Sequence, residues 1–211
     1  MLNYSDPNVL FYWLLILYFG PLIFGYVLGK IDMVRFESLV KVGQNLADPY
    51  TIRLHKWLSG YKSRWVKEGK WSGFFIMIFL NNLILSAFVT RVLYGVFFFV
   101  PLLYTVWNGI SHGVLFSTPK GKPSPSLVLE FAGYIFASVV GLSIGINLFT
   151  SLLAWIPPNP NIPWFYVGAS FLVILLGAAV ETLSINALSQ KVDLEDIDTQ
   201  KEKFMKNLNE E

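Results

Sequence analysis

Two carboxylic acids, one histidine and three asparagines lie inside long apolar stretches of this chain, where polar side chains are uncommon. These residues are Asn81, Asn82, Asn108, His112, Glu130 and Glu181. An imidazole beside carboxylates can bind a metal ion or pass a proton. The same groups can instead join helices by satisfying one another's hydrogen bonds. Both interpretations stay open from the residue types alone, and contacts between helices are the simpler one.

The spacing of these residues does not match a known catalytic pattern. The chain has no His-Glu-x-x-His and no Gly-x-Ser-x-Gly sequence. Ser111 and His112 are neighbours, so on one helix they project about 100° apart and make a poor nucleophile–base pair. The chain contains no cysteine, which excludes disulfides and thiolate sites. We therefore expect no enzymatic activity, no cofactor and no metal site.

Five apolar stretches must position these side chains. They cover residues 9–29, 73–93, 96–116, 127–156 and 164–188. A helix needs about 20 apolar residues to cross a bilayer, and each stretch meets that length. The run from 73 to 116 is too long for one span, so we expect a break near Gly95. With 54% hydrophobic residues, the sequence predicts an all-α polytopic membrane bundle of about five transmembrane helices.

The distribution of basic residues gives an orientation. All of the 16 Lys and Arg residues except Arg91 fall in segments that five spans place on one side of the membrane. The positive side is cytoplasmic, so the prediction is a cell-membrane protein with its N-terminus outside and its C-terminus inside. On this topology the rise per residue puts the polar residues named above at similar depths. We therefore expect one polar layer in the cytoplasmic half of the bundle.

This topology divides the chain into four segments. They are a first transmembrane helix at 1–29, a basic segment at 30–72, a four-helix membrane core at 73–188 and a tail rich in acidic residues at 189–211.

The basic segment is predicted to form a cytoplasmic amphipathic helix that begins at Asp48-Pro49. Its cations and aromatic rings suit an anionic lipid surface. The membrane-surface candidates are Arg53, Lys56, Trp57, Tyr61, Lys62 and Trp65. Packing of this helix against protein stays an equal alternative. Nucleic acid is disfavoured because the aromatic residues line the apolar face.

Small residues recur every fourth position in the fourth apolar stretch. They are Gly133, Ala137, Gly141 and Gly145. Such a stripe lets another helix approach closely in a membrane. The partner helix belongs either to the same chain or to a second copy. Gly109 and Gly113 form a shorter version of the stripe in the third stretch.

Residues from about 74 to 187 resemble the core of the stage II sporulation protein M family. The resemblance is carried by Asn81-Asn82, Gly95, Asn108-Gly109, Gly113, Glu130, Ala132, Gly141-Leu142 and Glu181. It implies a prokaryotic plasma-membrane protein that acts as a non-enzymatic scaffold. The family often has His-Gly a few residues before the Glu that opens the fourth span. This chain has SPSLVLE there, so the resemblance implies no catalytic role for His112.

Three functions are therefore considered. The leading one is a membrane scaffold that packs with itself or with other membrane proteins on the lipid bilayer, and it predicts a closed polar cluster. The second is a small transporter or channel component with an intramembrane ion or proton site, which predicts a water-connected cavity and broken helices. The third is an intramembrane hydrolase, which predicts an open pocket holding His112 and a carboxylate.

Overall fold

The computed structural model describes residues 6–31, 62, 64–97, 99–118, 121, 123–158 and 162–189. Regular structure in these ranges is helical, and they contain no strand. The helices are α1 (Pro7–Lys30), α4 (Trp71–Leu80), the π-helix η1 (Asn81–Val92), the 3₁₀ turn η2 (Leu93–Val96), α5 (Phe99–Ser117), α6 (Pro125–Ala154) and α7 (Trp164–Ser189). The chain is thus all-α over its described part, as its composition predicts.

Four helical segments are long and apolar enough to cross a membrane. They are α1, the continuous helix Trp71–Gly95, α6 and α7, as in a multi-pass membrane protein. The fifth predicted span corresponds to α5, which is not among these four. It has 19 residues, and Asn108, Ser111 and His112 reduce its apolar character.

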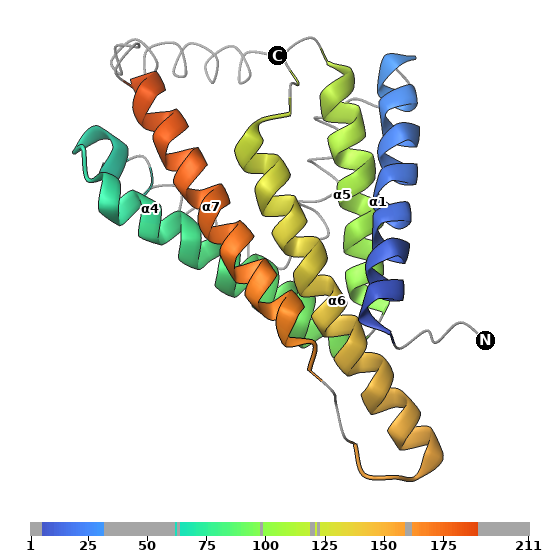
Figure 1. Ribbon diagram of the computed structural model, residues 1–211. Helices are drawn as coiled ribbons and strands as arrows, with labels where there is room; N and C mark the ends of the chain where they lie inside the picture. Colours follow the sequence, from blue (N-terminus) through green and yellow to red (C-terminus); the bar gives the residue numbers. More distant parts are fainter. Residues whose placement is uncertain are drawn as a thin grey trace, which may run out of the picture.

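The central helix of the bundle is α6. Of the 18 consecutive residues that make up its most apolar stretch, 56% are buried, whereas 22% are buried in the corresponding stretches of α1 and α7. Figure 1 shows α1 and α5 side by side next to α6, while α7 and α4 lie toward its other side. Successive long segments alternate in direction, so α1, α5 and α7 rise in this view while α4 and α6 descend. Any polar group on α6 can therefore face one of two separate helix interfaces.

The starts of α1 and α6 use the same local chemistry. Each begins with proline, whose missing N–H costs nothing in the first helical turn. The Asp6 side chain accepts a hydrogen bond from the Asn8 N–H at 2.9 Å. Ser124 Oγ accepts one from the Leu127 N–H at 3.2 Å. These caps fix where both helices begin.

Two glycines let α1 and α5 approach to backbone contact. A Cβ atom added at Gly109 would lie 2.5 Å from the Tyr18 carbonyl oxygen, and one at Gly113 would lie 2.6 Å from the Tyr26 nitrogen. Position 18 of α1 therefore faces 109 of α5, and 26 faces 113, so the two helices run parallel. Their association rests on close packing of small residues, which membrane helices use in place of the hydrophobic effect.

The π-helix η1 changes which residues face inward. Its i→i+5 bonding winds the chain more loosely than an α-helix does. The buried residues of η1 are Asn82, Ala87 and Arg91, at spacings of five and four positions. Arg91 is consequently only 3% exposed. The distribution of basic residues left Arg91 as the one cation away from the positive side, and the structure places its side chain in the protein interior.

The residues just before α4 pack on protein. A Cβ atom added at Gly73 would lie 3.3 Å from the Trp65 ring. Trp65 also borders a buried apolar cluster that includes Phe74. Glu68 pairs with Arg64 and Lys70, each at 2.7 Å, and these hydrogen bonds lower the pKa of Glu68 to about 2. Of the predicted membrane-surface set, only Lys62 and Trp65 are described. The others, Arg53, Lys56, Trp57 and Tyr61, lie outside the described residues.

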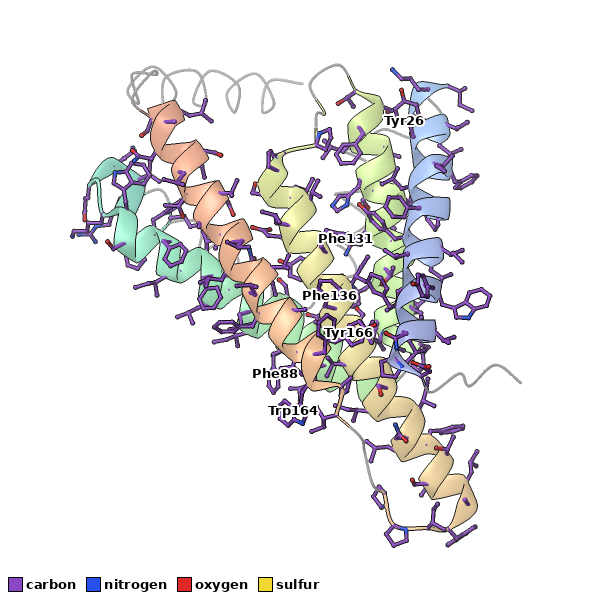
Figure 2. The ribbon with its side chains drawn as sticks, in the orientation of Figure 1. Tyr26, Phe88, Phe131, Phe136, Trp164 and Tyr166 are labelled. Atoms are coloured by element: carbon purple, nitrogen blue, oxygen red, sulfur yellow. The ribbon has the colours of Figure 1, made fainter. Side chains whose placement is uncertain are left out.

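An aromatic cluster joins the starts of α1 and α7 to the middle of α6. Phe136 lies 5.9 Å from the Tyr166 ring and 5.5 Å from the Phe11 ring. Figure 2 shows Phe136 and Tyr166 where α7 crosses α6. The Tyr166 hydroxyl donates to Asn8 Oδ1 at 2.8 Å. This hydrogen bond connects the start of α7 to the start of α1.

Candidate functional site

Glu130 of α6 and Glu181 of α7 lie together at the α6–α7 interface. Gly177, one turn before Glu181, leaves room for the Glu130 side chain, because a Cβ there would sit 2.9 Å from Glu130 Cγ. The Glu130 carboxyl interacts with Glu181 and with Asn82 of η1. Three helical elements therefore bring polar side chains to one point inside the bundle.

The amides of η1 complete this group but do not satisfy it fully. Asn81 Nδ2 donates to Asn82 Oδ1 at 3.2 Å. Two buried acceptors, Asn81 Oδ1 and Glu130 Oε1, have no hydrogen-bond partner within the described part of the chain. We call Asn81, Asn82, Glu130 and Glu181 the carboxyl cluster. Buried polar atoms are normally paired, so these two oxygens mark a place where a donor is missing.

The two carboxyl groups set the chemistry of the carboxyl cluster. Like charges in contact within a poorly solvated interface cannot both be sustained. The contact between Glu130 and Glu181 therefore creates a demand for a hydrogen-bond donor or a cation at this point of the interface.

His112 lies in a different interface. The Tyr18 hydroxyl and His112 Nδ1 are 2.8 Å apart, and the Tyr18 ring stacks on Phe131 at 3.7 Å. The histidine thus sits among α1, α5 and α6, and no described hydrogen bond joins it to Glu130 or Glu181. Glu130 and Phe131 are neighbours on α6, so they project about 100° apart and serve opposite interfaces.

The structure therefore divides the predicted polar layer. Asn81, Asn82, Glu130 and Glu181 come together, while His112 pairs with Tyr18 of α1 instead. The side chain of Asn108 takes part in neither group. Sequence reasoning missed Tyr18, because a tyrosine in an apolar stretch looks like ordinary core.

Arg91 forms a second buried polar centre that sequence reasoning did not identify. Its Nη1 donates to Ser138 Oγ at 3.1 Å and to Thr105 Oγ1 at 3.4 Å. Its guanidinium lies 5.6 Å from the ring centroids of both Tyr104 and Tyr134. Arg91 thus links η1 to α5 and α6 by charge-assisted and cation–π contacts. The available signal was a single arginine inside an apolar run.

The stripe of small residues on α6 contacts helices of the same chain. A Cβ at Gly133 would lie 2.5 Å from Ile174 Cγ1, and Ser170 Oγ donates to the Gly133 carbonyl at 2.9 Å. Ala137 is buried with Ile174 in one apolar cluster. Gly141 faces the backbone of Arg91 and Val92. Gly145 is buried as well.

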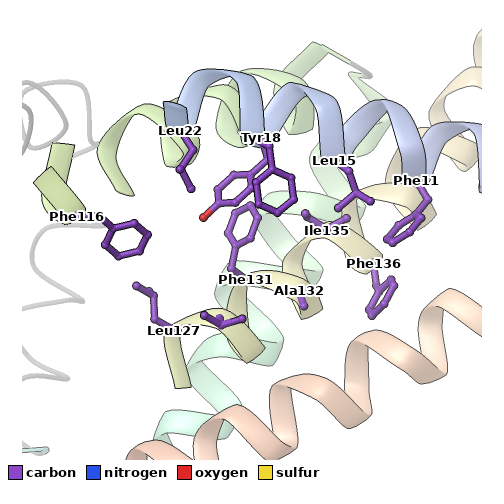
Figure 3. Close-up of a pocket in the computed structure, with 12 residues that line it drawn as sticks. Phe11, Leu15, Tyr18, Leu22, Phe116, Leu127, Phe131, Ala132, Ile135 and Phe136 are labelled. Atoms are coloured by element: carbon purple, nitrogen blue, oxygen red, sulfur yellow. The ribbon is translucent and has the colours of Figure 1, made fainter. Parts of the chain in front are cut away.

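An apolar groove of about 250 Å³ runs between α1 and α6. Figure 3 shows Leu15 and Leu22 of α1 on one side and Leu127 and Ile135 of α6 on the other. None of the four residues of the carboxyl cluster lines it. The groove and the carboxyl cluster are therefore separate features.

No protein-family model matches the chain. No curated protein matches it either, and no solved structure does. The resemblance to the stage II sporulation protein M family therefore stays a prediction.

Proposed function

We propose that this protein is a non-enzymatic integral membrane scaffold of the plasma membrane, which packs with a second copy or with other membrane proteins. The supporting observation is that polar side chains between the helices serve to join helices. Arg91 bonds Ser138, Tyr18 bonds His112, and Ser170 bonds the Gly133 carbonyl. A bundle tied in this way is a rigid body, which suits a scaffold.

The geometry argues against an intramembrane hydrolase. A nucleophile, its base and an orienting group must lie within hydrogen-bond reach of one another. His112 has Tyr18 at its Nδ1, and both carboxyls lie in a different interface. Tyr18 and His112 lie within hydrogen-bond reach, but no described carboxylate orients the imidazole, so the pair lacks the third group of such a site.

The proposal includes five membrane spans, with α5 as the third. This helix lies alongside α1 and runs parallel to it. A helix packed along a membrane span over most of its length lies at membrane depth, where the polar atoms of Ser111 and His112 can face protein. Five spans then give an external N-terminus and a cytoplasmic C-terminus.

Cysteine labelling tests this orientation directly, because the chain contains no cysteine. Single cysteines at Tyr4 and Asn159 should react with a membrane-impermeant maleimide in intact cells. A cysteine at Ser63 should react only after the membrane is permeabilised. Labelling of Ser63→Cys but not Tyr4→Cys in intact cells would reverse the topology, and labelling of both would contradict five spans.

The second candidate function is a transporter or channel component with a proton or ion site at the carboxyl cluster. Two observations favour it over a purely structural role. Asn81 Oδ1 and Glu130 Oε1 are buried acceptors without partners. The adjoining η1 is a long π-helix, and π-helical segments are often found at functional sites. The apolar groove, however, does not reach these oxygens.

Two substitutions at Glu181 separate these functions. In a scaffold, Glu181→Gln keeps the shape and hydrogen bonding of the side chain, so thermal stability and assembly size should be nearly unchanged. Glu181→Leu removes a hydrogen-bond partner of the Glu130 carboxyl, and leaving a buried polar group without its partner costs about 1–3 kcal/mol. Thermal unfolding and light scattering in detergent measure both effects.

The same variants are then reconstituted into liposomes with an internal pH-sensitive dye. A scaffold should give no proton flux above that of protein-free liposomes. A flux in the wild type that Glu181→Gln abolishes, at unchanged stability, would replace the scaffold by the transporter. A protein that stays monomeric and partnerless in native-membrane nanodiscs would also contradict the scaffold.

A further inference from the structure

We propose that the groove between α1 and α6 binds a single acyl chain of a membrane lipid. Its lining is apolar on both helices. The side chains that form it include Phe11, Leu15, Leu22, Leu127, Ala132 and Phe136. A groove of this kind at membrane depth meets lipid hydrocarbon rather than water, so an apolar occupant is available wherever the helices span the bilayer.

The rim of the groove gives lateral access from the membrane. Phe19 on the α1 side is 53% exposed and Val128 on the α6 side is 57% exposed. Both line the groove as well. An occupant can therefore slide in sideways from the bilayer without any helix moving.

The size of the groove selects a thin occupant. Along α1 it extends from Phe11 to Leu22, which is about 16 Å at 1.5 Å per residue. The groove offers about 250 Å³ over this length, a narrow space for a helix of about 10 Å diameter. A single hydrocarbon chain, about 4 Å wide at carbon contact distance, fits this space.

Two stacked rings line the middle of the groove, and the one hydroxyl they carry is already bonded. Tyr18 and Phe131 meet from the two helices with ring centroids 3.7 Å apart, and Figure 3 shows them facing each other. The Tyr18 hydroxyl is held by His112. The hydrogen bond to His112 satisfies the Tyr18 hydroxyl, which would otherwise lose its hydrogen bonding beside a hydrocarbon chain and make binding less favourable.

Charge at one end of the groove orients the lipid. The groove reaches Phe116 and Leu127, near the end of α5 and the start of α6. Lys30 ends α1 on this same side of the bundle, about 12 Å beyond Leu22 along the helix. Its Nζ lies 5.5 Å from the Tyr26 ring centroid. A cation at headgroup depth favours an anionic lipid whose chain runs from Leu22 toward Phe11.

Photo-crosslinking tests the site in the full-length protein. The chain is placed in nanodiscs that contain a phosphatidylglycerol carrying a diazirine on its acyl chain, irradiated, and mapped by mass spectrometry. Crosslinks should concentrate on groove residues of α1 and α6. Ala132→Trp fills the groove and should lower their yield at least fivefold. Ala187→Trp is a matched control, because Ala187 is exposed on α7 and does not line the groove.

A second variant tests the groove without adding bulk to the buried interior, so that a loss of crosslinking cannot be assigned to misfolding. Val128→Trp adds bulk only at the exposed rim, so it should fold and still lower the crosslink yield. The preference for phosphatidylglycerol over phosphatidylcholine should fall about fivefold in Lys30→Gln. Crosslinks spread evenly over the exposed faces of α1 and α7 would overturn the proposal. So would an unchanged yield in both groove variants. Neither outcome bears on the scaffold itself.

Discussion

Replacing Gly113 with leucine is expected to lower the midpoint of thermal unfolding by about 10 °C. A Cβ at this position would lie 2.6 Å from the Tyr26 nitrogen and 3.0 Å from the Gly25 carbonyl carbon, and the Leu22 carbonyl oxygen is closer still. Backbone atoms cannot rotate away as a flexible side chain can. Overpacking costs about 1–3 kcal/mol, and more where backbone must shift. Each kcal/mol lowers the midpoint by about 2–4 °C in a chain of this size.

Gly20→Leu is the matched control for Gly113→Leu. Gly20 belongs to α1, the helix that Gly113 contacts, and a Cβ there would meet no atom within 4 Å. Leucine at this position should change the unfolding midpoint by no more than a few degrees. Equal midpoints for the two variants, measured in detergent by intrinsic fluorescence, would show that α1 and α5 do not pack as described.

The membrane class and most helix positions could be predicted from composition and run length alone. Apolar stretches of about 20 residues have few alternatives to membrane helices. The break near Gly95 could be predicted because a run of 44 residues, from 73 to 116, exceeds the membrane thickness. The observed helix Trp71–Gly95 and the start of α5 at Phe99 agree with that expectation. These features depend on local sequence, which is why they could be predicted.

The pairing of helices could not be predicted, because it depends on which faces meet. Gly109 and Gly113 indicated a close contact, but nothing in the sequence named α1 as the partner. His112 was grouped with Glu130 by depth, although depth carries no information about direction around α6. The structure separates His112 from Glu130 because Phe131, the next residue, turns toward Tyr18.

The burial of Arg91 escaped prediction for a different reason. An α-helical projection places residues every three to four positions on one face. In η1 the inward positions are instead 82, 87 and 91, because the π-helix changes the phase partway along the span. Standard periodicity would therefore assign residues after Asn82 to the wrong face. The isolated charge in an apolar run was a usable signal of a functional or structural centre.

Gly141→Leu is expected to have an effect as large as that of Gly113→Leu, on the opposite side of the bundle. A Cβ at Gly141 would lie 3.1 Å from Val92 Cα and closer still to the Arg91 carbonyl oxygen. Gly95 packs on the same site, since its own Cβ would sit 2.6 Å from the Gly141 carbonyl oxygen. A leucine must push η1 and η2 away from α6.

That displacement should also break the contacts of Arg91. Its Nη1 reaches Ser138 at 3.1 Å, and Ser138 lies one turn from Gly141 on α6. A buried guanidinium that loses its partners costs more than the loss of packing alone. We expect Gly141→Leu to cost at least about 3 kcal/mol, near the upper end of overpacking, and thus to lower the midpoint by roughly 10 °C.

Two comparisons make this last prediction specific. Gly168→Leu on α7 should be tolerated, because a Cβ there meets nothing within 4 Å. Arg91→Met removes the buried charge while keeping much of the side-chain volume, so it should cost less than Gly141→Leu. In the Arg91→Met background, Gly141→Leu should cost less than in the wild type, because there is no buried guanidinium whose hydrogen bonds could be broken. If the two costs simply add, the penalty at Gly141 is steric alone and does not pass through the Arg91 guanidinium. If Gly141→Leu leaves the unfolding midpoint unchanged, α6 does not pack against η1 through its glycine stripe.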